Sequence, residues 1–221
     1  MATKRNTDES RPRGRPRLTI DRDAVADAVA ELFAEGGYDA VSIVDTAEKL
    51  SVSRATLYRT VPTKQDLLGI LFERSTKELT DQVHATVAQS GDSRTTLIEL
   101  IRLQAAAAVN MRSYMPVFFG GGDLPPDVFA RWHTWSRRYE KIWVDVVEKS
   151  MRDGHLADGD PLVTTRLILG MIIWVSRWYR PNQKISPAEI AQTAVDLLQL
   201  QNTPTLRKRQ GAATRRNRRA D

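Results

Sequence analysis

Apolar and polar positions alternate along this chain with the period of an α-helix. Hydrophobic residues recur at intervals of three and four, and no stretch shows the period of two that a half-buried strand requires. Helices are expected at the following residues: 21–35, 42–50, 53–60, 63–89, 94–112, 127–153, 161–179 and 186–200. The pattern therefore predicts an all-α protein.

Hydroxyl and carboxylate side chains three residues apart mark the starts of several of these helices. In a capping box the hydroxyl accepts a free backbone N–H, and the carboxylate lies in the first turn, where the helix dipole favours it. Three such pairs are present: Ser42 with Asp45, Thr63 with Asp66, and Ser186 with Glu189. Asp160 precedes Pro161 and predicts a further start, because proline is favoured at the first helical position.

The stretch between the first two capping pairs predicts a helix-turn-helix. Ser51 and Ser53 interrupt the helical pattern, and a small set of apolar residues can pack across that break. The set consists of Ile43, Ala47, Leu50, Val52 and Leu57. Two short helices would then share one small core.

The outward side of the second short helix carries groups that can read DNA. Arg54, Ala55 and Thr56 offer a bidentate donor, a small apolar contact and a hydroxyl, which suit base edges in a major groove. Tyr58 and Lys64 can hold phosphates. Spacing alone leaves a second interpretation open, in which the pair of helices is structural and its polar face is only solvated.

The segments AELFAEGGYDAVSI and SVSRATLYRTVPTKQDLL resemble the N-terminal domain of the TetR/AcrR family of one-component transcriptional regulators. The resemblance implies that Ser42 caps the first short helix against a phosphate. It also implies the roles already named for the second helix, with three side chains over bases and two on the DNA backbone. Two positions depart from the family pattern: Ser51 replaces the usual glycine, and Val61 replaces the usual aromatic residue.

Aromatic residues are concentrated in the second half of the chain. Its tryptophans are Trp132, Trp135, Trp143, Trp174 and Trp178. Rings at helical spacing fill the interior of a bundle, and they also line ligand cavities. Nearby arginines, including Arg138 and Arg177, would suit an amphipathic anion at the mouth of such a cavity, or they form solvated rims or dimer contacts.

The segments RRYEKIW, RDGHL and ILGMIIWVSRWYRPNQKISPAEIAQTAVDLL resemble TetR regulators that respond to acyl-CoA thioesters of fatty-acid or sterol catabolism. The resemblance implies a small-molecule effector and a homodimer whose four-helix bundle uses the helices beginning at Pro161 and Pro187. The expected ligand-binding residues are Phe118, Trp135, Arg138, Trp174, Arg177 and Trp178.

Charge divides the 221-residue chain, whose net charge is +6, into unlike parts. Residues 1–17 carry six basic and two acidic side chains, and residues 201–221 carry seven basic and one acidic. The segment 18–74 has six basic side chains against ten acidic ones. Phosphate affinity must therefore come from a few placed residues and from the two tails, which we expect to be disordered.

The N-terminal arm contains a short arginine motif. Arg13, Arg15 and Arg17 resemble the core of an AT-hook, in which arginines lie along a narrow A·T-rich minor groove. A basic arm that binds DNA without regard to sequence remains the alternative. The C-terminal tail adds DNA affinity or only improves solubility.

Several classes of function are not supported by the sequence. The chain has no cysteine, its longest uninterrupted apolar run is short, and its three histidines are scattered without metal-ligand spacing. We expect no enzyme activity, cofactor, metal or membrane segment, and a cytoplasmic, nucleoid-associated protein.

The sequence predicts a homodimeric repressor that binds a palindromic double-stranded operator and a small-molecule effector. Its expected parts are a basic arm at 1–17, a DNA-binding domain at 18–74, a ligand-binding and dimerisation domain at 75–200, and a basic tail at 201–221. The alternative is a DNA-architectural protein that uses both tails and has no ligand response.

Overall fold

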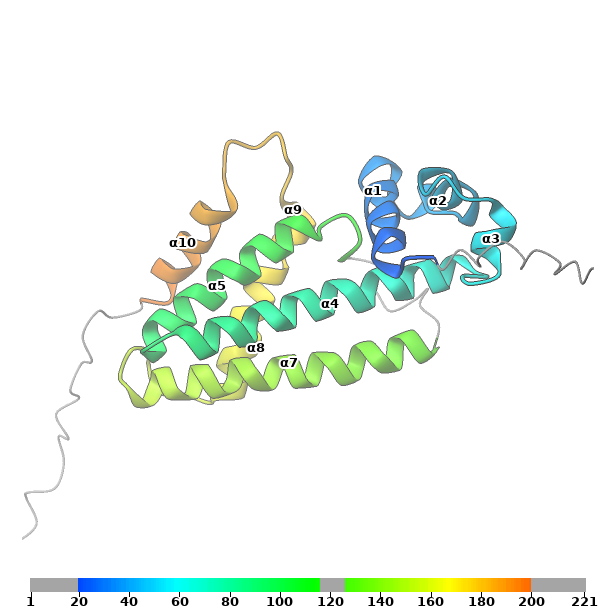
Figure 1. Ribbon diagram of the computed structural model, residues 1–221. Helices are drawn as coiled ribbons and strands as arrows, with labels where there is room; N and C mark the ends of the chain where they lie inside the picture. Colours follow the sequence, from blue (N-terminus) through cyan, green and yellow to red (C-terminus); the bar gives the residue numbers. More distant parts are fainter. Residues whose placement is uncertain (1–19, 116–125, 200–221) are drawn as a thin grey trace, which may run out of the picture.

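The computed structural model describes residues 20–115 and 126–199, and this part of the chain contains helices and no strand (Figure 1). The helices are α1 (Arg22–Ala40), α2 (Ile43–Lys49), α3 (Arg54–Tyr58), α4 (Lys64–Gln89), α5 (Ser93–Asn110), α7 (Pro126–Arg152), α8 (Pro161–Ile173), α9 (Val175–Trp178) and α10 (Pro187–Leu197). The all-α prediction is confirmed.

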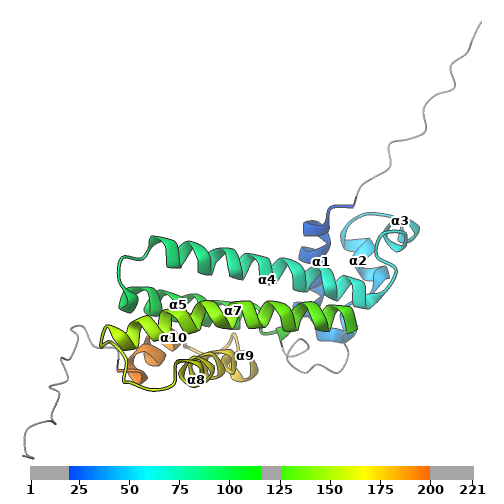
Figure 2. The same ribbon diagram turned by 90° about the horizontal axis from the view of Figure 1, so that it is seen from below.

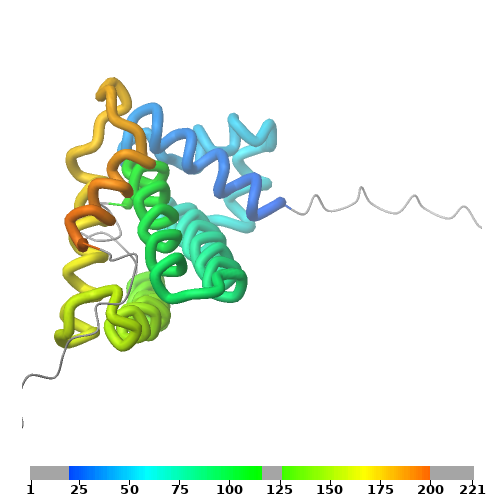
Figure 3. The backbone as a smooth tube through the Cα atoms, turned by 90° about the vertical axis from the view of Figure 1, so that its left-hand side faces the viewer, coloured from blue at the N-terminus to red at the C-terminus, as the bar shows by residue number. Residues whose placement is uncertain are grey.

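Helix α4 runs through the length of the molecule, with α1, α2 and α3 gathered around its N-terminal end (Figure 1). Helix α7 lies along the same direction, and α8, α9 and α10 form a layer on the side away from α4 (Figure 2). Helix α5 lies at the centre of this bundle and contacts α4, α7, α8 and α10 (Figure 3). The DNA-reading candidates therefore lie at one end of the molecule, and α8, α9 and α10 lie towards the other (Figure 1).

The N-terminal unit folds around a small core that the apolar pattern predicted. Asp21 caps α1 by accepting the Asp23 N–H at 2.9 Å, and the buried face of α1 consists of Val25, Ala26, Ala28, Val29, Leu32 and Phe33. Regular helical geometry ends at Gly36 and Gly37, and Gly37 has a φ of 68°, which favours glycine. The expected stop at this glycine pair is confirmed.

Helix α4 begins and ends where its signals predicted. Thr63 and Asp66 form a complete capping box, in which each side chain accepts the backbone N–H of the other residue. The helix continues without interruption to Gln89. Its first half packs into the N-terminal core through Leu67, Leu68 and Leu71, and its second half packs into the C-terminal core through Leu79 and Val83.

The single helix expected at 161–179 is wrong in one respect, because the chain divides it into α8 and α9 at Trp174. Trp174 keeps right-handed helical dihedral angles, but its N–H is shared between the carbonyls of Gly170 and Ile172. The Arg177 N–H then bonds to the Trp174 carbonyl, three residues back, at 2.9 Å. This tighter hydrogen bonding interrupts the regular ladder without reversing the chain. The last helix ends at Leu197, slightly before the expected end at 200.

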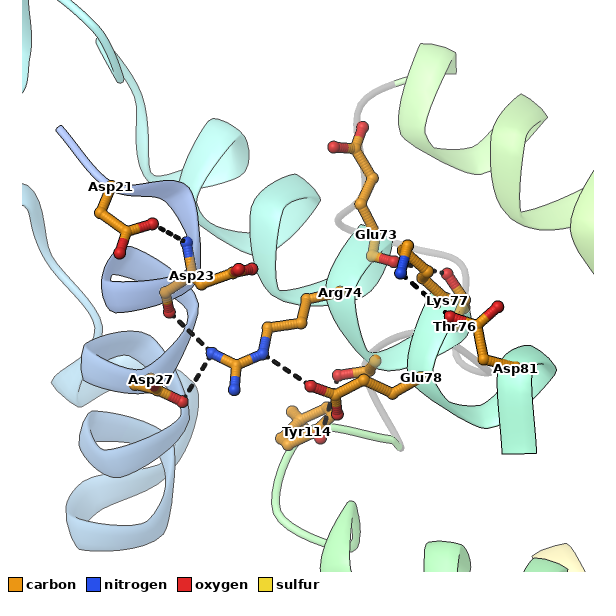
Figure 4. Close-up of polar contacts among 11 residues, drawn as sticks. Asp21, Asp23, Asp27, Glu73, Arg74, Thr76, Lys77, Glu78, Asp81 and Tyr114 are labelled. Carbon is orange, nitrogen blue, oxygen red and sulfur yellow. Dashed lines mark hydrogen bonds and ion pairs between the residues drawn. The ribbon is translucent and has the colours of Figure 1, made fainter. Parts of the chain in front are cut away.

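Ion pairs connect α1 and α7 to α4, and one partly buried ring joins the two cores. Arg74 on α4 bonds to Asp27 on α1 at 2.7 Å and to Glu78 at 2.8 Å (Figure 4). Glu73 receives Arg22 from α1 and Arg131 from α7. The ring of Trp135 packs against both hydrophobic clusters, so the two cores are continuous at this residue.

None of the helices within 20–115 and 126–199 combines the length and the apolar character that crossing a bilayer would need. The same residues contain no group of histidine, aspartate and glutamate side chains placed to hold a metal ion.

Candidate DNA-binding surface and ligand cavity

The turn between α2 and α3 is fixed by backbone hydrogen bonds that end α2. The N–H of Ser51 bonds to the carbonyl of Glu48 at 2.9 Å, and that of Val52 bonds to the carbonyl of Ala47 at 3.0 Å. These two bonds make a Schellman motif, which requires a residue with positive φ just after the helix. Ser51 occupies that position with a φ of 53°, so serine adopts the conformation for which glycine is favoured.

Helix α3 is anchored on one side and exposed on the other. Ser53 caps it by accepting the Thr56 N–H at 3.1 Å, and Leu57 is fully buried in the N-terminal core. Arg54, Ala55 and Tyr58 lie on the surface, and 59% of Tyr58 is exposed. Burial of Leu57 therefore fixes which side of α3 faces outward.

Three of the predicted DNA contacts also make contacts within the protein. The Thr56 hydroxyl shares a hydrogen bond with Ser53 at 2.7 Å. Lys64 donates to the Tyr38 carbonyl at 2.5 Å and lies 3.7 Å from the centre of the Tyr38 ring. Ser42 caps α2 by accepting the Asp45 N–H at 3.1 Å. These contacts hold the polar atoms in place beside the exposed face of α3.

The basic residues of this unit separate into two groups. Arg22, Lys49 and Arg74 bond to carboxylates, and Glu35 and Glu31 raise the pKa of the Lys49 ammonium. Arg54 and Arg59 form no ion pair within the part of the chain that the structure describes. Although 18–74 is acidic overall, the positive charges left unneutralised lie on and next to α3.

A cavity of about 270 Å³ lies between α4, α5, α7 and α8. It is lined by Phe72, Ser75, Thr76, Leu79, Gln104, Met111, Met115, Trp132, Trp135, Ser136, Tyr139, Glu140, Arg166, Leu169, Gly170 and Ile173. Its aromatic wall is ordered: the Trp135 ring stacks on Tyr139 at 5.0 Å and meets Phe72 edge-on at 6.1 Å. Most of this surface is apolar, as expected for a small-molecule site.

Two pairs of polar side chains on the cavity wall bond to each other. At the buried wall, the Tyr139 hydroxyl donates to Oε1 of Gln104 at 2.5 Å, and burial raises the pKa of Tyr139, so the hydroxyl stays protonated. At the exposed rim, Arg166 bonds to Glu140 through two N–H groups at 2.7 and 3.2 Å. The cavity therefore has one neutral polar wall and one charge-paired rim.

The structure separates the predicted ligand-binding residues. Trp135 lines the cavity, whereas Trp174 and Trp178 line a different groove of about 420 Å³ between α8, α9 and α10. Arg138 and Arg177 are exposed and belong to the wall of neither. The remaining predicted residues, Phe118 in the ligand set and Arg13, Arg15 and Arg17 in the arm, lie outside the described residues.

The groove is part of a wider apolar surface. Its neighbours include exposed large hydrophobic residues on α8 and α10: Leu162, Val163, Leu167, Met171 and Leu197. Trp174 itself is 63% exposed. A surface of this kind is typical of a protein interface rather than of a small-molecule site.

Sequence reasoning missed several residues of the cavity, chiefly Gln104. A signal for it exists, because Gln104 falls on the apolar face of α5 in register with Leu97, Ile101 and Ala108, where a polar residue is unexpected. Arg59, exposed at the end of α3, was also left out of the predicted DNA contacts, although its charge and position provided the signal.

Two family models match separate parts of the chain. The family model described as "Bacterial regulatory proteins, tetR family" matches residues 25–69, and the model described as "Tetracyclin repressor-like, C-terminal domain" matches residues 90–201. A curated relative, the HTH-type transcriptional repressor KstR2 of Rhodococcus jostii, is 22% identical over 180 residues, covering 80% of this chain and 88% of that protein.

Solved structures show the same fold. A TetR/AcrR regulator from Thermobifida fusca is 26% identical, with a TM-score of 0.70, covering 80% of this chain and 96% of that chain. The regulator AibR, solved with isovaleryl coenzyme A and operator DNA, is 20% identical, with a TM-score of 0.69, covering 80% and 97%. Since one family model alone spans residues 90–201 and a second matches the helix-turn-helix, the chain belongs to the TetR family of bacterial regulatory proteins.

Proposed function

We propose that this protein is a ligand-responsive transcriptional repressor that releases its operator when a small molecule enters the cavity. The observation that carries the proposal is the placement of α4, which joins the two sites. Leu67 and Leu68 at its start are buried beside α3, and Phe72, Thr76 and Leu79 further along form part of the cavity wall. A shift of this one helix would move the DNA-binding surface relative to the bundle.

In the proposed complex α3 enters the major groove, with Arg54, Ala55 and Thr56 over bases. Tyr58, Lys64 and the backbone at Ser42 would hold phosphates. The exposed guanidinium groups, which form no ion pair within residues 20–115 and 126–199, and the fixed orientation of α3 support this assignment. The division into an operator-reading part at 18–74 and an effector and dimerisation part at 75–200 belongs to the same proposal, as does a contribution of the basic arm and tail.

We assign the apolar surface of α8 and α10 to a homodimer. A second copy seated on Trp174, Leu167 and Leu197 would bury the large side chains that one chain leaves exposed. Two α3 helices related by a two-fold axis require a palindromic operator whose half-sites lie about one helical turn, or a multiple of it, apart.

For the effector we propose an acyl-CoA thioester, the class of ligand named for AibR. A cavity of about 270 Å³ suits the acyl group and leaves the nucleotide portion outside. Arg138, which is exposed and adjacent in sequence to the cavity-lining Tyr139, would face those phosphates. Coupling of about 1 to 3 kcal/mol between ligand and operator would give roughly 5- to 150-fold release.

The test begins with selection of genomic DNA fragments by the full-length protein at physiological salt. We expect a palindrome, and fluorescence anisotropy should then show that isovaleryl-CoA, but not free coenzyme A, weakens binding to it. An A·T-rich set of fragments without symmetry would contradict the repressor and favour an architectural role.

Two matched variants locate the effector. Ser136→Phe places a ring in the cavity, so we expect it to keep operator affinity and lose the response to isovaleryl-CoA. Thr134→Phe adds the same ring two residues away on the exposed surface of α7, outside the cavity wall, and should respond as the wild type does. An unchanged response in Ser136→Phe would place the effector elsewhere.

A further inference from the structure

The buried wall of the cavity holds an amide group with unused hydrogen-bonding capacity. Gln104 is only 2% exposed, lines the cavity from α5 and accepts the Tyr139 hydroxyl hydrogen on Oε1. Its Nε2 carries two N–H groups, and neither donates a hydrogen bond within residues 20–115 and 126–199. Nε2 is not one of the fully enclosed atoms that lack a partner, so it faces the open space of the cavity, where an acceptor atom of a ligand can take its hydrogen bond.

The orientation of the amide follows from its neighbour. Tyr139 is 6% exposed and protonated, so its hydroxyl hydrogen needs an acceptor. With the Gln104 amide as observed, Oε1 supplies that acceptor and Nε2 remains free. The reversed amide would leave both the tyrosine hydrogen and Oε1 unsatisfied, which is unfavourable. Gln104 therefore presents a donor, and not an acceptor, to the cavity.

The other polar side chains on the wall are already engaged. The Thr76 hydroxyl donates to the Phe72 carbonyl at 2.8 Å, and the Ser136 hydroxyl donates to the His133 carbonyl at 3.1 Å. Ser75 shares a hydrogen bond with Tyr114 at 3.1 Å. At the rim, the charge of Arg166 is matched by Glu140. Among the residues that the structure describes, the buried wall thus offers a neutral donor and no unpaired cation.

We propose that Gln104 recognises a neutral carbonyl oxygen on the part of the effector that enters the cavity, and that this hydrogen bond selects among apolar ligands. The inference rests on the proposed function only in taking this cavity as the effector site. A carboxylate at the same place would be buried without a cation, which is costly, whereas a ketone or ester oxygen needs one donor. Tyr139 acts as a positioning residue by holding Oε1 away from the ligand.

The test uses two neutral probes of nearly equal size, the bicyclic ketone 2-decalone and its parent hydrocarbon decalin. Binding to the full-length protein is measured by isothermal titration calorimetry, and we expect the ketone to bind about tenfold more tightly. The double variant Gln104→Met, Tyr139→Phe replaces both polar partners by apolar groups of similar shape, so it should fold, bind decalin as before and lose the preference for the ketone. Tyr139→Phe alone removes the donor that holds Oε1, so the amide can turn either way and the preference for the ketone should fall between that of the wild type and that of the double variant.

Thr134→Ala removes a hydroxyl on the exposed surface of α7, outside the cavity wall, and it serves as the control that keeps the preference. Equal binding of the two probes by the wild type, binding of neither, or a preference that persists in the double variant would each overturn the inference. The proposed function fails separately: a ketone preference that depends on Gln104 without any release of operator by isovaleryl-CoA would leave the carbonyl site standing and remove its role as an acyl-CoA switch. If isovaleryl-CoA releases the operator equally well from the double variant and from the wild type, the proposed function stands and Gln104 has no part in recognising that effector.

Discussion

The two ends of this molecule are packed in different ways. In the N-terminal unit, residues close in sequence form both the core and the exposed surface, so the buried Leu57 and the exposed Arg54 lie within one turn of each other. In the C-terminal bundle, helices far apart in sequence enclose a space of about 270 Å³ that their side chains do not fill. A surface that reads DNA needs a rigid support. A cavity that accepts a ligand must remain unfilled in the free protein, so its region forgoes some of the packing that would stabilise it.

Truncation of one leucine in each region should give the largest effects and the clearest contrast. Leu57→Ala leaves a void in a fully packed core, so we expect the free energy of unfolding to fall by about 3 to 5 kcal/mol. Leu79→Ala removes a side chain that already borders open space, and we expect a smaller loss, about 2 kcal/mol. Urea denaturation measures both. Equal losses would mean that the cavity is not a gap in the packing.

Arg54→Ala should separate DNA affinity from stability. Arg54 forms no ion pair among the residues described, so its removal should leave the melting temperature unchanged. Loss of a base contact should weaken operator binding by about 1 to 3 kcal/mol and relax specificity at one base pair. Anisotropy titrations with operator and mismatched DNA check this. Lys77→Ala, on α4 away from α3, is the control, and a similar loss there would point to a general charge effect.

Ser51→Gly tests how the DNA-binding unit holds its turn. Serine pays a conformational cost at a φ of 53°, which glycine does not, so the substitution should stabilise the protein by about 0.5 to 1 kcal/mol. The gain is limited because glycine also increases the freedom of the unfolded chain. Thermal denaturation shows whether the substitution raises or lowers the stability of the protein. A loss of stability would show that the serine side chain contributes a contact of its own.

The smallest effect concerns pH and the start of α10. Hydrogen bonds from the Ser186 backbone and side chain lower the pKa of Glu189 below its ordinary value of 4.5. A lowered carboxyl pKa adds stability above the unfolded value, and that stability is lost as pH falls from about 4.5 through the folded value. Glu189→Gln removes the charge, so it should lower the melting temperature slightly at pH 7 and approach the wild-type value as the pH falls below about 4.5, which flattens the acid decline. If the melting temperatures of the variant and the wild type depend on pH in the same way, this prediction is contradicted.

The sequence predicts contacts between residues close together in the chain better than contacts between distant helices. Helix starts at Ser42, Thr63 and Ser186 could be read directly, because a cap depends on residues three positions apart. The aromatic residues of 127–153 left core and ligand interpretations open, and the structure divides them: Trp143 is fully buried in the core, whereas Trp135 lines the cavity. Helical spacing places side chains on one face but does not say what that face meets.

The sequence by itself determined the helix starts, the helix-turn-helix and the outward face of α3, since each depends on neighbours within one or two turns, and it determined the division of charge by composition alone. Only the tertiary structure decided that Trp135 and Trp174 face different spaces, that Glu140 neutralises Arg166, and that Gln104 meets Tyr139. Those contacts join helices whose crossing angles and register are set by the packing of the entire bundle, and no local pattern of residues encodes them.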